Sequence, residues 1–218
     1  MAAPRRRWPR EPFCAVSHGL GAILSAGGLL LLLWQARGNP WHVTSFALYG
    51  TSLIFLYGAS ALYHSLHTSE RGAEVLMRLD HSAIYLLIAG TYAPVCLIAL
   101  RGAWGWSLLG AEYAIAAVGI GSALLWRKAP DWWRVVLYLG MGWLVVLALG
   151  PLSRQLPAAG MAWLVAGGVT YSVGAVIYAI DRPHLWPGRF SAHDLWHLFV
   201  LGGSICHFVV VSAYLAHL

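Results

Sequence analysis

The stretch HDLWHLFVLGGSICHFVVVSAYLAHL covers residues 193–218 and combines a long apolar run with polar side chains at its start. A helix needs about 20 apolar residues to cross the ~30 Å hydrocarbon core of a bilayer, and this stretch supplies them. Its first turn nevertheless holds two histidines and an aspartate, His193, Asp194 and His197. Ionisable groups at a membrane boundary are candidates for a functional site, because placing them there is costly.

The composition of the whole chain is that of an integral membrane protein. Of the 218 residues, 59% are hydrophobic and 10% are charged, whereas soluble domains have about 45–50% apolar and about 25% charged residues. The net charge of +6 forms no basic stripe with interleaved aromatic residues, so nucleic acid is not an expected partner. The three cysteines include no CxxC pair, and the sequence therefore predicts neither a disulfide framework nor a thiolate metal site.

Seven apolar stretches of suitable length follow one another, separated by short connections rich in Gly and Pro. The first is longer than the apolar core of a cleaved signal peptide, so we expect it to be retained as a helix. The sequence predicts an all-α fold, a seven-helix transmembrane bundle over residues 15–218, with a basic cytoplasmic segment over 1–14. The spans are expected near residues 15–34, 42–64, 79–100, 104–126, 131–150, 160–180 and 193–216.

The distribution of Lys and Arg predicts the orientation, with the N-terminus cytoplasmic and the C-terminus outside. With that orientation, eleven of the fourteen basic residues lie in cytoplasmic segments, as the positive-inside rule requires. The cytoplasmic group is Arg5, Arg6, Arg7, Arg10, Arg71, Arg78, Arg127, Lys128, Arg134, Arg182 and Arg189. The outer group is Arg37, Arg101 and Arg154.

The predicted topology brings several titratable residues to one depth. His64 ends the second span, Asp80 lies in the first turn of the third, and His193 and His197 open the seventh. All of these helix ends are expected at the cytoplasmic side. His193 and His197 are spaced i and i+4, so they share one helix face and can share one ligand.

Three neutral imidazoles around one metal, with a fourth position open to water, are the arrangement of a catalytic zinc site. We therefore expect His64, His193 and His197 to bind Zn²⁺. Asp80 can then act as a base towards the zinc-bound water or orient a ligand. Zinc lowers the pKa of its water towards about 7 and polarises carbonyl groups, which is the chemistry of amide or ester hydrolysis.

Other polar residues of the spans have no assigned role. His207 is 14 residues beyond His193, or about 21 Å along a helix, and cannot join the same metal. His81 points about 100° away from Asp80 and is expected to support the site or to pack. Glu112 lies inside the fourth span, either protonated or hydrogen-bonded within the bundle, and a functional role stays open.

Three segments carry a resemblance to a known family: SALYH at 60–64, RLDHSAIYLLIAGTYAP at 78–94 and HDLWHLFVLGGSICHF at 193–208. With them the chain resembles, over essentially its whole length, the hemolysin III branch of the progestin and adipoQ receptor (PAQR) family. The resemblance implies seven helices with a cytoplasmic N-terminus and zinc held by His64, His193 and His197. It also implies an Asp and a Ser nearby, Asp80 and Ser60, and a superfamily of membrane hydrolases that includes alkaline ceramidases.

The chain departs from the family at one position. The family often has E-x-x-N-x-x-x-H before the first span, whereas this chain has Glu11, Cys14 and His18 at the three positions. A cysteine thus replaces the amide. The roles of Glu11 and His18 stay open for that reason.

Two classes of function follow as hypotheses. The first is a zinc-dependent, ceramidase-like hydrolase of lipid amide or ester bonds in the inner leaflet of a bacterial cytoplasmic membrane, with membrane lipids as partners. Ser60 would hydrogen-bond the ligand there, and Asp80 would act as the base. The second is a non-catalytic sensor or regulator of membrane state with structural zinc. A pore-forming haemolysin has only the family name in its favour.

Overall fold

The computed structural model describes residues 9–126, 129–183, 185–186 and 190–218, and these residues form helices joined by short turns. Within them, seven helices or helix runs are long and apolar enough to cross a membrane, which confirms the predicted all-α architecture. They are α1 (Pro12–Gln35), α2 (Pro40–Ser65), α3 (Glu70–Pro94) with a π-helical turn (Val95–Ala99), α4 (Ala103–Leu125), α5 (Asp131–Trp143) continued by α6 (Leu149–Leu152), α7 (Ala158–Ile180) and α8 (Ala192–Val209), which continues to His217.

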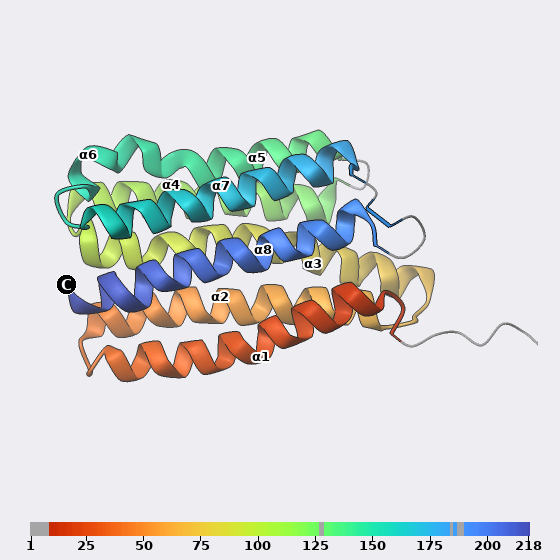
Figure 1. The fold of residues 1–218 in the computed structure, drawn as a ribbon. Coiled ribbons are helices and arrows are strands. Elements are labelled where there is room, and N and C mark those ends of the chain that lie inside the picture. The colour runs from red at the N-terminus through yellow and green to blue at the C-terminus, as the bar shows by residue number, and fades with distance from the viewer. Residues whose placement is uncertain (1–8, 127–128, 184, 187–189) are drawn as a thin grey trace, which may run out of the picture.

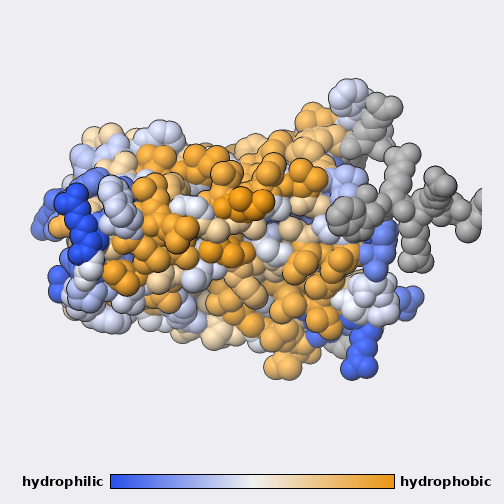
Figure 2. Space-filling view, turned by 90° about the horizontal axis from the view of Figure 1, so that it is seen from below, coloured by the Kyte–Doolittle hydropathy of each residue, from blue (hydrophilic) through white to orange (hydrophobic). Residues whose placement is uncertain are grey.

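The helices form one bundle in which α8 lies between α7 and α1 (Figure 1). Helix α1 packs on α2, α2 on α3, and α7 on α8. Figure 2 shows an apolar surface over the middle of the molecule, with hydrophilic residues gathered towards its two ends. Such a belt is the surface expected of a bundle whose sides face lipid.

Helix α3 begins earlier than the sequence predicts. The Ser69 hydroxyl accepts a hydrogen bond from the Gly72 amide at 3.2 Å and starts the helix at Glu70. Asp80 therefore lies ten residues beyond Glu70 rather than in the first turn, and that prediction is wrong. Hydropathy marks where a helix enters the apolar layer, whereas the polar turns before it follow capping and local propensity.

The fifth span is not one regular α-helix, because a 3₁₀ segment (Leu144–Ala148) separates α5 from α6. Tyr92 of α3 satisfies the backbone groups that this change of geometry frees. Its hydroxyl donates to the Met141 carbonyl at 2.7 Å and accepts from the Val145 amide at 2.9 Å. Irregular backbone at membrane depth requires such partners, since lipid offers none.

We expect Tyr92→Phe to lower stability by about 1–2 kcal/mol, because it leaves backbone groups of the fifth span without a partner. The measurement is the unfolding midpoint of the purified protein in detergent. Tyr49→Phe is the matched control: its buried hydroxyl has no hydrogen-bond partner among the described residues, so its removal is expected to be neutral. Equal midpoints for the two variants would contradict this account of the fifth span.

The starts of α1 and α8 and the end of α2 lie at one end of the bundle (Figure 1). The Glu11 amide, just before α1, donates to the His64 carbonyl at 2.9 Å and ties two of these ends together.

We propose that this end faces the cytoplasm, from the charge bias described above. An alkaline phosphatase fused to the C-terminus should then be active, and an N-terminal tag should resist protease added from outside. The reverse pattern would reject the orientation.

Candidate metal centre

His64 stands one residue before the end of α2, and Glu11 fixes the orientation of its ring. The His64 Nδ1 lies 2.6 Å from the Glu11 carboxylate oxygen Oε2, while Arg10 pairs with the other oxygen at 3.3 Å. The hydrogen bond from His64 lowers the pKa of Glu11 below its usual value. The opposite ring nitrogen of His64 is buried and has no hydrogen-bond partner among the described residues. A carboxylate on one ring nitrogen and a free second nitrogen are typical of a histidine that binds metal.

His193 and His197 come from the first two turns of α8. They share one helix face as predicted, and their Nε2 atoms lie 3.2 Å apart. In a tetrahedral zinc site with Zn–N bonds of about 2.0–2.1 Å, two ligand nitrogens are about 3.3–3.4 Å apart. The observed spacing therefore fits two ligands of one ion.

Asp194, between the two histidines in sequence, has a structural role at the start of α8. Its carboxylate accepts a hydrogen bond from the Ser191 amide at 2.7 Å, and the Ser191 hydroxyl accepts one from the Asp194 amide at 3.2 Å. This reciprocal pair is a capping box, which satisfies free amides at a helix start. The pair fixes the turn that presents His193.

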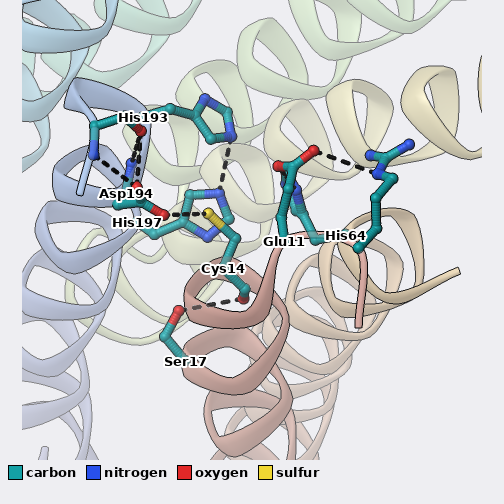
Figure 3. Close-up of polar contacts among 9 residues, drawn as sticks. Glu11, Cys14, Ser17, His64, His193, Asp194 and His197 are labelled. Carbon is teal, nitrogen blue, oxygen red and sulfur yellow. Dashed lines mark hydrogen bonds and ion pairs between the residues drawn. The ribbon is translucent and has the colours of Figure 1, made fainter. Parts of the chain in front are cut away.

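A cysteine joins the three histidines. One potential ligand atom from each of Cys14, His64, His193 and His197 lies within 4.8 Å of the other three (Figure 3). The Cys14 thiol donates a hydrogen bond to Asp194 at 3.2 Å, across 180 residues of sequence. The sequence predicted no thiolate ligand because it has no CxxC pair. Cys14 escapes that pattern because its neighbours come from other helices. A group of nitrogen and sulfur donors suits zinc better than calcium or magnesium, which prefer oxygen.

Asp80 and Ser60 lie beside this group but outside it. Asp80 is next to the Ser60 hydroxyl and near His64, and both residues line the same cavity as His193 and His197. The structure thus gathers all five predicted site residues at one end of the bundle. It leaves Asp80 and Ser60 free to face a ligand rather than the metal.

The cavity beside the histidines has a volume of ≈ 130 Å³, and its wall is mostly apolar. It runs from His197 to His207, which also lines it. These residues are ten positions apart on one helix, or about 15 Å. His207 stacks on Tyr171 with ring centroids 5.5 Å apart and lies outside the group of potential metal ligands found among the described residues, as predicted. The cavity therefore extends over about 15 Å along α8.

His18 belongs to the site although the sequence assigned it no role. Its ring is 3% exposed and lies against the His197 ring with centroids 3.9 Å apart. Glu11, Cys14 and His18 are spaced i, i+3 and i+7, so one face of the first turns of α1 meets the cluster. Only the E-x-x-C-x-x-x-H spacing signalled this face in the sequence.

Two other polar residues have clear places. The His81 carbonyl accepts a hydrogen bond from the Tyr138 hydroxyl at 3.1 Å, and His81 also lines the cavity. Glu112 is completely buried in α4, and its two carboxyl oxygens have no hydrogen-bond partner among the described residues. Glu112 does not belong to the group of potential metal ligands found among the described residues.

We expect Glu11→Gln to weaken metal binding about 10- to 100-fold, because a neutral amide holds the His64 ring less firmly than a carboxylate does. Zinc affinity, measured by competition with a chelator, tests this. Glu70→Gln makes the same change at an exposed position near the same end and should leave the affinity unchanged. Equal affinities for the two variants would contradict the role given to Glu11.

Comparisons with known proteins show the family of the chain. Residues 6–208 match the family described as haemolysin-III related. Hemolysin-3 of Bacillus cereus is 42% identical over 202 residues, covering 92% of this chain and 89% of that protein. The hemolysin-3 homolog of Bacillus subtilis (strain 168) is 39% identical over 202 residues, or 92% of both chains. The adiponectin receptor protein of Drosophila melanogaster is 25% identical over 217 residues, covering 90% of this chain and 48% of that protein.

Proposed function

The chain belongs to the haemolysin-III-related family of multi-pass membrane proteins, and from this premise we propose that it is a zinc-dependent hydrolase of lipid amide or ester bonds. One observation carries the proposal. His193 and His197 line an apolar cavity whose wall also presents Asp80 and Ser60, and His64 lies together with these two histidines. Apolar pockets with a few convergent polar groups are the usual form of sites for small molecules and lipids.

The residues divide the chemistry among them. His64, His193 and His197 would hold the zinc ion, which supplies a Lewis acid for a carbonyl group and activates water near neutral pH. Asp80 takes the proton of the attacking water and returns it to the leaving group. Ser60 donates a hydrogen bond to the ligand, and Glu11 keeps the His64 ring in place. The apolar wall holds an acyl chain and excludes bulk water from the reacting bond.

The location follows from the same features. The relatives from Bacillus and the basic bias of one set of loops support a bacterial cytoplasmic membrane, with the metal at the inner leaflet. A lipid entering from that leaflet would place its head region at the histidines and its tail along α8.

A lipid-release assay tests the function. The purified protein, loaded with one equivalent of zinc, is incubated with ceramides and with glycerolipids, and released fatty acid is measured. We expect release with one of these classes and none after the metal is removed by a chelator. Absence of release from both classes by protein with verified zinc would overturn the hydrolase.

A second candidate function has a specific observation in its favour. Cys14 lies with the three histidines, and four protein ligands make a closed, structural zinc site. If all four side chains held the zinc permanently, the ion would tie α1, α2 and α8 together and leave no position for water. Such a structural site is what a non-catalytic regulator of membrane state would need. The choice between the two functions therefore depends on whether Cys14 can leave the metal.

A further inference from the structure

Cys14 is placed as a ligand rather than as a residue of the apolar core. It is 1% exposed and sits on the α1 face that also carries Glu11 and His18. The potential ligand atoms of Cys14 and the three histidines are mutually within 4.8 Å. The buried ring nitrogen of His64, which has no hydrogen-bond partner among the described residues, is a second, independent indication of a metal site in this group.

The thiol also has a partner away from the histidines. Its hydrogen bond to the Asp194 carboxylate is 3.2 Å long, and that carboxylate is already held by the capping box at the start of α8. A cysteine that leaves a metal here is therefore not left as an unsatisfied buried group. The carboxylate position does not have to change, since the capping box fixes it.

We propose that Cys14 is an exchangeable fourth ligand that closes the metal site at rest and gives up its position when a ligand carbonyl arrives. The inference rests on the metal site of the proposed function. In the closed state the thiol loses its proton to water as the sulfur–metal bond forms. In the open state that bond breaks, the sulfur takes a proton back from water, and the thiol donates to Asp194.

Exchange of Cys14 accounts for both interpretations of the site, the structural one and the catalytic one. Four protein ligands describe the closed state, and three histidines with a free position describe the open state. Because thiolate is a good zinc ligand, the closed state protects the metal from adventitious ligands when no lipid is present. The chain thus carries its own competitive inhibitor at position 14.

Cobalt provides a test that does not depend on hydrolysis. The full chain, purified in detergent, is loaded with Co²⁺, and its absorption spectrum is compared with those of Cys14→Ser, Cys96→Ser and Cys206→Ser. We expect a thiolate-to-cobalt charge-transfer band in the near ultraviolet, lost in Cys14→Ser and retained in both other variants. The visible cobalt bands should persist in Cys14→Ser, which verifies that its three histidines still bind.

The outcomes separate the two proposals. Cobalt bound to the wild type without the charge-transfer band, or with a band that survives Cys14→Ser, overturns the role of Cys14 alone. No cobalt binding overturns the metal site itself and with it the proposed function. If Cys14→Ser does not fold, X-ray absorption of the zinc-loaded wild type decides, since a sulfur ligand at about 2.3 Å is distinct from nitrogen at about 2.0–2.1 Å.

Acetohydroxamate, a small oxygen chelator, tests the exchange. Added to the cobalt protein, it should bleach the charge-transfer band of the wild type as the thiol is displaced. Binding seen in the visible bands with an unchanged charge-transfer band would contradict exchange and leave Cys14 as a permanent structural ligand.

Discussion

Replacing Asp80 by Asn is expected to reduce lipid hydrolysis about 10²–10⁴-fold while the protein keeps its fold and its metal. The magnitude is that of losing one general base or acid. Asn has nearly the same shape as Asp and can still hydrogen-bond to the Ser60 hydroxyl, but it cannot accept a proton near neutral pH. The measurements are the initial rate of fatty-acid release and the zinc content of the same preparation.

Ser60→Ala provides the comparison for this result. We expect a milder loss, because the Ser60 hydroxyl hydrogen-bonds rather than transfers the proton. The contrary result is that Asp80→Asn loses its zinc or its fold while the wild type cleaves no lipid. Asp80 would then have a structural role, and the regulator function would be favoured over the hydrolase.

Loss of metal in the histidine variants is the second large effect. We expect His64→Ala, His193→Ala and His197→Ala each to weaken zinc binding, and the triple variant to lose it entirely. His217→Ala, at the exposed C-terminal end, is the control that removes a histidine without touching the site. Metal content measured by mass spectrometry decides, and a triple variant that retains zinc would refute the assignment.

Acidification should have the same effect as these substitutions. Imidazole binds metal only in its neutral form, so zinc should leave as the pH falls and protons compete for the ring nitrogens. Glu11 supports the site over a defined pH range. Since its pKa is lowered, it contributes fully above the ordinary glutamate range, and that contribution is lost only as pH falls through the lowered value.

The sequence predicted most of the bundle for a simple physical reason. Apolar stretches of bilayer length are local features, and so is the i, i+4 spacing of His193 and His197. Alternation of the spans then placed His64 and Asp80 at the same end without any knowledge of packing. The start of α3 was misplaced because its first turns are polar and capped by Ser69.

The contribution of α1 was beyond such reasoning. Glu11 is 53 residues from His64, and Cys14 is 180 residues from Asp194. Whether the first turn of α1 faces the cluster or the lipid depends on how α1 packs on α2. The hydropathy pattern does not encode the rotation of α1 about its axis, because a single Cys or Glu at the start of a helix barely changes the mean hydropathy of that helix.

Anomalous X-ray scattering at the zinc absorption edge, from crystals of the zinc-loaded protein, tests the central claim most directly. We predict one strong peak per chain, within bonding distance of a ring nitrogen of each of His64, His193 and His197. A zinc-loaded crystal with its peak elsewhere, or with no peak among these three side chains, would contradict the account.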